Sequence, residues 1–186
     1  MTQAERNEQT CEQFRSALVE LLQEKPIARI SVRELSEKTN LHRGTFYLHY
    51  TDIYALQEDL ENKVLEEFRK TLEAHSPEEM AKDILPLIEA VFRFFEEHRQ
   101  YLTAVMSEHL TIYNRVIEVL RQKCYEDWDH ILAHPNKENY GPYFDYLAAG
   151  SVGLLTHWLE NPERPAEEMA QLTKTLILSG FGVLRT

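Results

Sequence analysis

The chain has 186 residues, of which 43% are hydrophobic, so it can bury one core or a small unit joined to a larger one, but not two large domains. It contains no apolar run of about eighteen residues and no signal-peptide pattern, and we therefore expect a cytoplasmic protein without a membrane partner. Its two cysteines, Cys11 and Cys124, are too few for a disulfide framework and lack zinc-binding spacing, so we predict no cofactor and no bound metal.

Charge is distributed unevenly along the chain. The net charge of −11 argues against a nucleic-acid partner, because phosphate binding requires positive charge at the contact. Residues 1–50, however, carry seven basic and seven acidic side chains, so the whole net charge belongs to residues 51–186. Basic side chains outnumber acidic ones by four to two within residues 26–50. Repulsion of the acidic part would turn the basic part toward DNA, although an acidic surface also simply favours solubility.

Helical periodicity covers nearly the whole sequence, and no strand-like alternation interrupts it. We therefore predict an all-α fold of about nine helices. The first helix runs from about residue 4 to residue 24, just before Pro26. Ser31 and Glu34 have the spacing of a capping box, which starts a second helix at residue 32. That helix stops near Asn40, a residue that tolerates the left-handed turn conformation.

A third helix, at about residues 42–49, is too short to be stable alone, so we expect packing of Leu41, Phe46 and Tyr50 to hold it. Thr51 or Asp52 caps a long fourth helix that ends at about residue 73. A capping box at Ser76 opens another helix, which Pro86 either kinks or interrupts. The remaining helices are predicted at about residues 85–97, 99–107, 110–133, 142–160 and 165–183, with a loop at residues 134–140.

Three short helices followed by a long one, with a turn of about four residues between the second and third, have the geometry of a DNA-binding helix-turn-helix. The segments Ile30–Ser36 and Asn40–Tyr50 strongly resemble the signature of the TetR/AcrR family of transcriptional regulators. That signature ends in a Gly-Thr-hydrophobic-Tyr-x-x-aromatic run, which residues 44–50 match. The resemblance implies a DNA-binding domain at residues 1–50, continuing into the fourth helix to about residue 56, and a C-terminal regulatory and dimerisation domain at residues 51–186.

The resemblance also implies which side chains meet DNA. Phe46 and Tyr50 match buried anchors of the family, whereas Tyr47 and His49 match positions that touch phosphate. Residues 42–45 match the part of the helix that faces base edges, where arginine pairs with guanine and glycine permits close approach. Ser31, at a helix N-terminus, can present backbone N–H groups and its hydroxyl to a phosphate. The predicted DNA-binding residues are Ser31, Arg33, His42, Arg43, Gly44, Thr45, Tyr47 and His49.

The chain departs from the family signature at two places. The usual Ala-Gly before the recognition helix is Thr39-Asn40, and the usual lysine at the start of the fourth helix is Ile53, which removes a phosphate contact. Simpler interpretations also stand beside the functional ones. Tyr47 can be a core aromatic, the two histidines of the third helix can be plain solvated side chains, and Arg33 can form a surface ion pair instead of a DNA contact.

Residues 143–159 are apolar around most of a helix circumference, more than one helix of a small unit can bury internally. The last helix is also strongly apolar, so we predict that these two helices pair with their copies in a four-helix homodimer interface. Close packing within one chain is the alternative. The predicted interface residues are Leu147, Gly150, Leu154, Trp158, Leu172 and Leu176. A homodimer agrees with the resemblance, because TetR-type proteins generally read palindromic operators.

The family resemblance further implies a cavity for a small apolar effector that releases the protein from DNA. The aromatic side chains of the middle helices are candidates for its walls, although aromatic residues at helical spacing are more often ordinary core. The candidate effector residues are Phe92, Phe95, Tyr101, Met106, Tyr113, Trp128, Tyr146 and His157.

Other functions have less support. His130 and His134 share a helix face, but no third ligand accompanies them in a metal-binding motif. The sequence contains no nucleophile elbow, phosphate-binding loop or recognisable carboxylate pair, so we predict that the protein is not an enzyme. The prediction is a transcriptional regulator, most often a repressor in this family. The alternative is a helical interaction protein that has lost DNA binding, which only Ile53 and the acidic total favour.

Overall fold

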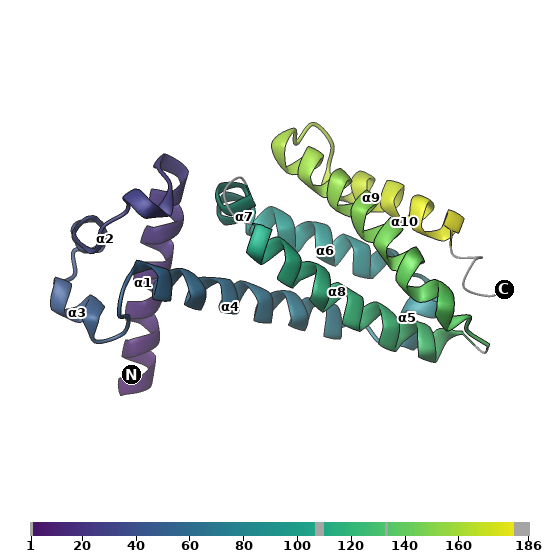
Figure 1. The fold of residues 1–186 in the computed structure, drawn as a ribbon, viewed down its shortest axis with the longest axis horizontal. Helices are drawn as coiled ribbons and strands as arrows, with labels where there is room; N and C mark the ends of the chain where they lie inside the picture. Colours follow the sequence, from purple (N-terminus) through teal and green to yellow (C-terminus); the bar gives the residue numbers. More distant parts are fainter. Residues whose placement is uncertain (1, 107–109, 133, 181–186) are drawn as a thin grey trace. The chain divides into compact units, whose positions relative to one another are not determined.

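The structure is a computed structural model that describes residues 2–106, 110–132 and 134–180. Within these ranges the chain contains helices and no strands, which confirms the predicted all-α fold (Figure 1). The α-helices are α1 (Gln3–Glu24), α2 (Val32–Thr39), α3 (Arg43–Tyr47), α4 (Ile53–Glu73), α5 (Pro77–Lys82), α6 (Leu85–Glu97), α7 (Arg99–Met106), α8 (Leu110–Ile131), α9 (Tyr140–Glu160) and α10 (Ala166–Gly180). No described helix combines the length with the apolar character needed to cross a lipid bilayer.

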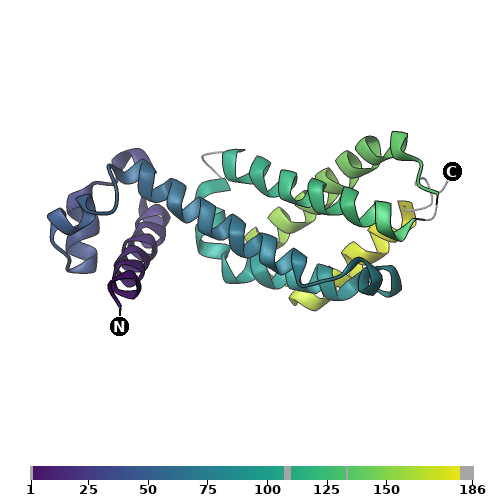
Figure 2. The same ribbon diagram turned by 90° about the horizontal axis from the view of Figure 1, so that it is seen from below.

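The helices form two compact units. The head unit comprises Met1–Val64 and Gln100–Ile112, and the body unit comprises Leu65–Arg99 and Tyr113–Thr186. Helix α4 contributes residues to both units (Figure 2). The head unit thus contains α1 to α3, the first part of α4 and most of α7.

The core of the head unit is built from buried apolar side chains on α1 to α4. Phe14, Leu35, Phe46 and Leu56 come from α1 to α4 and are all 0% exposed. The rings of Phe14 and Phe46 meet edge to face, with 5.3 Å between their centroids. Since an isolated helix of five residues is unstable, this packing is what holds α3 in place.

The boundaries of α2 agree with the prediction from sequence. The Ser31 hydroxyl accepts a hydrogen bond from the Glu34 N–H, and the Glu34 carboxylate accepts one from the Ser31 N–H, which completes the capping box. Asn40 follows the helix with a φ of 55°, in the left-handed region. The start of α4 is capped by Asp52, whose Oδ1 accepts a hydrogen bond of 2.9 Å from the N–H of Ala55.

A buried arginine joins α1 to α4 within the head unit. The Arg15 side chain is 4% exposed and donates to the carboxylates of Glu12, at 2.9 Å, and Asp59, at 2.6 Å. Burial alone would lower the pKa of Arg15, but these carboxylates raise it above its usual value. The hydroxyl of Tyr50 also donates to Asp59, at 2.7 Å. One carboxylate therefore connects α1, α4 and the residue that ends the α3 segment.

The body unit is organised around α6, which packs against α9 and α10 (Figure 2). Phe92 of α6 meets Trp158 of α9 edge to face, with a centroid distance of 5.3 Å. Helix α10 turns one apolar face inward at spacings of three and four residues, a pattern expected of a helix with a buried stripe. The buried residues of α10 are Ala166, Met169, Ala170 and Thr173.

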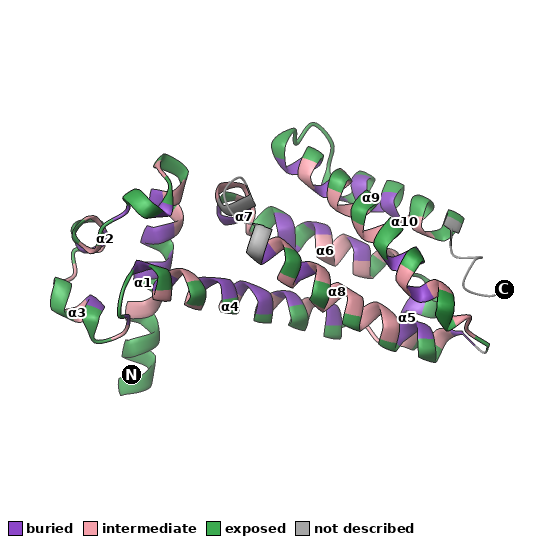
Figure 3. Cartoon of the chain, viewed as in Figure 1, coloured by how far each residue is buried: buried purple, intermediate pink, exposed green. Residues whose placement is uncertain are grey.

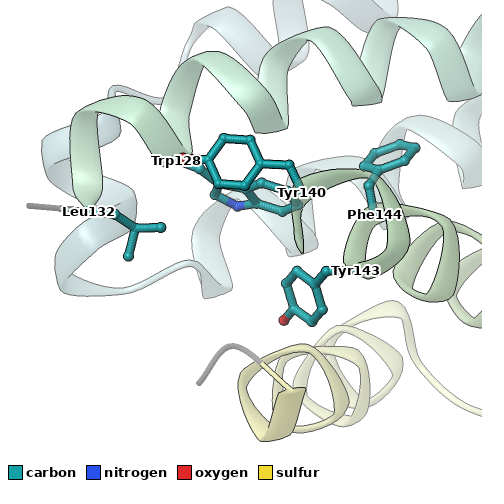
Figure 4. Close-up of a cluster of buried hydrophobic side chains, with 5 residues drawn as sticks. All are labelled: Trp128, Leu132, Tyr140, Tyr143 and Phe144. Carbon is teal, nitrogen blue, oxygen red and sulfur yellow. The ribbon is translucent and has the colours of Figure 1, made fainter. Parts of the chain in front are cut away.

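A second cluster in the body unit joins the end of α8 to the beginning of α9 (Figure 4). Its buried members are Trp128, Leu132, Tyr140, Tyr143 and Phe144. The hydroxyl of Tyr143 donates a 2.7 Å hydrogen bond to the carbonyl oxygen of Ile177, so the same cluster also fastens α9 to α10. The hydroxyls of both tyrosines in this cluster, Tyr140 and Tyr143, thus have acceptors although their rings are buried.

Some boundaries in the body unit differ from the predictions. The helix that opens at Pro77 ends at Lys82 and α6 begins at Leu85, so the chain restarts at Pro86 instead of kinking. Helix α9 begins at Tyr140, because proline is tolerated in a first helical turn and Pro142 therefore does not mark the start. The predicted loop before it contains a 3-10 helix, Lys137–Asn139. The predicted end of the last helix, at residue 183, lies outside the described residues.

The capping box of α2 predicts an acid-dependent loss of stability. Hydrogen bonds from Lys25 and Ser31 lower the pKa of Glu34 from its ordinary value of 4.5 to about 2. A depressed pKa stabilises the fold above the unfolded-state value and loses that effect as the pH falls through the folded-state value. Thermal unfolding followed by circular dichroism should therefore show the wild type more stable than Glu34→Gln near neutral pH. The difference should disappear by about pH 2. A difference that is constant with pH would contradict this account.

Candidate nucleic-acid interface

Helix α3 lies at the surface of the head unit, and only one side of it is buried (Figure 3). Phe46 is 0% exposed and Tyr50 is 7% exposed, whereas Tyr47 is 59% exposed. The alternative that Tyr47 is a core aromatic is therefore excluded for the head unit. Arg43 and Gly44 are also exposed, and Thr45 and His49 are half-buried. This short segment thus has an aromatic underside and an exposed outer side that includes Arg43 and Tyr47.

His42 caps α3 with its own ring. Its Nδ1 accepts a 3.1 Å hydrogen bond from the N–H of Gly44. A neutral histidine ring that accepts at Nδ1 carries its proton on Nε2, which is left as a hydrogen-bond donor. A Cβ added to Gly44 would lie 3.2 Å from that Nδ1, so glycine also gives the ring room to make the cap. His42 is exposed, and its Nε2 donor is available to an acceptor from outside the chain.

The N-terminus of α2 already has an anionic partner. The Ser31 N–H and hydroxyl both donate to Glu34 Oε2, at 2.9 and 2.7 Å, so the two groups that we expected to meet a phosphate are engaged within the chain. Arg33, one turn along, is exposed but pairs with Glu37 at 2.7 Å. A phosphate at this end of α2 must therefore compete with two carboxylates.

Other cations near α3 are also paired. Lys25 pairs with Glu34, and Lys38 lies 2.7 Å from Glu20. In contrast, Arg29 and Arg43 are exposed and form no ion pair with any described residue. Two arginines in the segment around α2 and α3 are consequently free to meet a DNA phosphate or base without first losing a carboxylate partner.

The residue at the start of α4 belongs to the core. Ile53 is 7% exposed and cannot contact a phosphate, which agrees with the loss of the lysine usual at this position. Two large apolar side chains nearby are exposed, although the sequence did not identify them as site residues. Leu48 is 82% exposed and Tyr54 is 59% exposed. The signal that identifies Leu48 is its spacing of four residues from Gly44, which places both on one side of the helix.

The predicted dimer residues divide into an exposed face and one core residue. Gly150 is open, with no atom within 4 Å of an added Cβ, Leu172 is 36% exposed and Leu176 is 49% exposed. Trp158 is only 1% exposed, and its indole N–H donates to the carbonyl oxygen of Arg164 at 2.8 Å. The structure therefore corrects the assignment of Trp158, which packs inside its own chain because it faces α6.

An apolar groove runs between α9 and α10 on this exposed face. Its volume is about 300 Å³. Leu147 and Leu154, also predicted at the interface, are half-buried and line it together with Gly150 and Leu176. The exposed ring of Tyr146 stands at the same groove. Five of the six predicted interface residues thus lie on one surface formed by two helices.

The candidate effector residues do not form one group in the described structure. Phe92, Phe95 and Trp128 are buried in the body unit, where Phe95 meets Phe68 and Trp128 belongs to the α8–α9 cluster. Tyr101 is buried in the head unit, and Tyr113 is half-buried. Tyr146 and His157 are exposed, which places them outside any interior cavity. The side chain of Met106 lies outside the described residues. Among the described residues, no three potential metal ligands come together.

Comparison with known proteins identifies the class of the chain. Residues 82–179 match the family model of the C-terminal region of TetR-type transcriptional regulators. The chain therefore belongs to the TetR family of transcriptional regulators, and the resemblance of its N-terminal segment to that family agrees with this membership. Its relatives are regulators and not enzymes.

One curated relative is YxbF, an HTH-type transcriptional regulator of Bacillus subtilis (strain 168). It is 26% identical over 164 residues, which cover 84% of this chain and 41% of the relative. The chain thus spans about two fifths of the length of this relative.

Solved structures share the fold at low sequence identity. The activator of a dihydroxyacetone kinase operon, DhaS, superposes with a TM-score of 0.69 at 15% identity, covering 95% of this chain and 98% of DhaS. A TetR-family regulator from Streptomyces coelicolor gives 0.72 at 15% identity, covering 95% and 82%. SmeT, the repressor of the Stenotrophomonas maltophilia multidrug efflux pump SmeDEF, gives 0.72 at 14% identity, covering 91% and 88%.

The pairing of basic residues predicts how binding to a random-sequence duplex depends on salt. Each phosphate neutralised by a cation steepens the plot of log affinity against log salt by about 0.9. In the wild type, Arg33 reaches a phosphate only by leaving Glu37, which then attracts a cation from solution, so the exchange releases few ions overall. Glu37→Gln removes the competing carboxylate, so the slope should steepen by about 0.9 per chain in fluorescence-anisotropy titrations at several salt concentrations.

A matched control for this change is Glu58→Gln. Glu58 is exposed on α4 of the same unit and holds no cation among the described residues, so its replacement removes the same charge without releasing an arginine. It should raise affinity with little change of slope. Parallel slopes for the wild type and both variants would contradict this prediction, because release of Arg33 would then add no phosphate contact.

Proposed function

We propose that this TetR-family regulator binds a palindromic DNA operator as a homodimer, with α3 of each copy in the major groove. The observation that carries the proposal is the exposed side of α3, where Arg43 and Tyr47 point outward from a helix pinned by Phe46. Two such helices would enter major grooves about 34 to 36 Å apart, one turn of the duplex. Under this proposal residues 1–50, with α4 to about residue 56, bind DNA, and residues 51–186 dimerise and regulate.

The side chains of α3 supply both kinds of DNA contact. Arg43 has no carboxylate partner among the described residues and can make a bidentate pair with guanine O6 and N7. The Nε2 of His42 and the hydroxyl of Thr45 are donors suited to base edges, and Gly44 lets the backbone come close. Tyr47 and His49 donate to phosphate, which positions the helix without reading sequence.

Residues at the N-terminus of α2 add contacts that require an exchange of partners. The ion pair between Arg33 and Glu37 is exposed on both sides, at 71% and 59%, and such pairs contribute little stability. A phosphate can therefore replace Glu37 as the partner of Arg33 at small cost. Ser31 lies at the same helix end, where backbone N–H groups favour an anion.

The exposed face of α9 and α10 is the proposed dimer interface. Helix α10 already uses one side to pack on α6, yet Leu172 and Leu176, one turn apart on another side, remain 36% and 49% exposed. An apolar face of this kind, with open glycines on the neighbouring helix, fits a second copy related by a two-fold axis. The helices of both copies would then form a four-helix interface.

Repression is the proposed direction of regulation, because a dimer that covers an operator excludes other proteins from that DNA. Among the proteins of similar fold, DhaS is an operon activator and SmeT is a repressor. A small apolar effector bound by the C-terminal domain is proposed to release the protein. The buried aromatic residues Phe92 and Phe95 of α6 are the members of the predicted effector set that an interior site in the body unit would use.

Arg43→Ala tests base recognition. Loss of a bidentate contact should weaken binding to the cognate operator, sought in the DNA upstream of the gene, by about 1 to 3 kcal/mol and should weaken binding to random DNA much less. The matched control is Arg29→Ala, which removes the other unpaired arginine from outside α3 and should weaken both complexes equally. Anisotropy titrations measure both. Equal losses for Arg43→Ala on the two duplexes would reduce its role to a phosphate contact.

Leu176→Arg tests the dimer. A charge at the centre of the proposed interface should convert the dimer to a monomer in sedimentation experiments and lower operator affinity by about 100-fold, because two linked heads bind far more tightly than one. Asn114→Arg places the same charge on an exposed position of α8 and should leave the dimer intact. A Leu176→Arg variant that sediments as a dimer would mean that another surface joins the copies.

A further inference from the structure

Leu48 is the most exposed large apolar side chain in the part of the chain that the structure describes, at 82%. It follows the last residue of α3 with a helical backbone conformation, φ −75° and ψ −21°, and its N–H bonds to the carbonyl oxygen of Thr45. The helical turn therefore continues through Leu48. A leucine held this way buries little of its side chain against its own chain, so the side chain is available to an occupant from outside.

The direction of Leu48 follows from the burial of Phe46. An α-helix turns by about 100° per residue, so positions two before and two after a residue point about 160° away from it. Phe46 faces the core at 0% exposure, and Gly44 and Leu48 are those two positions. Leu48 thus stands at the centre of the outward side of α3. Because Gly44 carries no side chain, a ligand can approach the backbone closely at the first turn on that side.

Electrostatics in this region favour an apolar contribution to DNA recognition. Two arginines near α3, Arg29 and Arg43, are without ion pairs among the described residues, and Ile53 is buried where the family usually has a lysine. Phosphate contacts by free cations are accordingly few. In the major groove, the feature that an apolar side chain reads is the C5-methyl group of thymine.

We propose that Leu48 contacts the C5-methyl group of a thymine and thereby selects thymine at one position of each operator half-site. The inference rests on the proposed DNA-binding function and deepens it by adding a specificity residue. Duplex DNA is the occupant that continuity favours, because Leu48 lies within about 60° around the helix of Gly44 and Thr45, two of the residues proposed to meet bases.

Replacement of single operator thymines by deoxyuridine tests this contact, because it removes the methyl group and keeps base pairing. Loss of the methyl group from the contacted thymine in one half-site should weaken wild-type binding by about fourfold. Loss of the methyl group in both half-sites should weaken it by about fifteenfold. Leu48→Ala removes the contact from both half-sites, so it should bind the thymine operator at least about fifteenfold more weakly and should not respond further to deoxyuridine at that position. Leu48→Met keeps an apolar side chain and should retain the response.

The outcomes separate the thymine contact from DNA binding itself. A wild type that binds its operator but tolerates every deoxyuridine replacement refutes the contact alone. A Leu48→Ala variant that keeps full operator affinity, or the full deoxyuridine response, refutes it as well and points to a protein partner for this side chain. A wild type that binds no duplex refutes the proposed function and the contact together. Circular dichroism of Leu48→Ala should match the wild type, since the side chain is exposed.

Discussion

Helix α3 has five residues, and the contact between the buried rings of Phe46 and Phe14 is what makes it a helix at all. Every outward-facing group of α3 depends on that contact, because it sets the rotation of α3 about its own axis. With Phe46 inward, Gly44 and Leu48 must face outward, and Tyr47 stands at the side with most of its ring exposed. Tyr50 extends the same anchorage, since its buried ring lies beside Phe46 and its hydroxyl bonds to Asp59 of α4.

Several charged side chains of the head unit form ion pairs with one another and so contribute to the stability of the unit itself. Arg15 is buried among carboxylates that join α1 to α4, while Lys25 and Arg33 are paired with glutamates of α2. These pairs differ in what they leave for DNA. The buried arginine is committed to the fold, whereas the exposed pair of Arg33 with Glu37 can be exchanged for a phosphate at little cost. Recognition by the remaining free arginines and by an apolar side chain is consistent with a chain whose net charge is −11.

The body unit illustrates how one helix can serve two surfaces. Residues 166, 169, 170 and 173 of α10 are buried and α10 packs on α6, whereas the leucines at 172 and 176 lie on a more exposed side of the same helix. Both stripes are apolar, so hydrophobicity by itself cannot show which is core and which is interface. The same ambiguity on α9 led to the assignment of Trp158 to the dimer face, although its ring packs on Phe92 within the chain.

The sequence by itself determined the helical fold, the capping boxes at Ser31 and Ser76, the turn at Asn40 and the family, because these depend on local hydrogen-bonding geometry and on residues close together in the chain. The tertiary structure decided matters that depend on contacts across the chain. It showed that the Ser31 groups and Arg33 already have carboxylate partners, that Trp158 is core, and that the aromatic candidates for an effector site are scattered. It also showed that Leu48 faces outward, since only the packing of Phe46 against a distant helix fixes the rotation of α3.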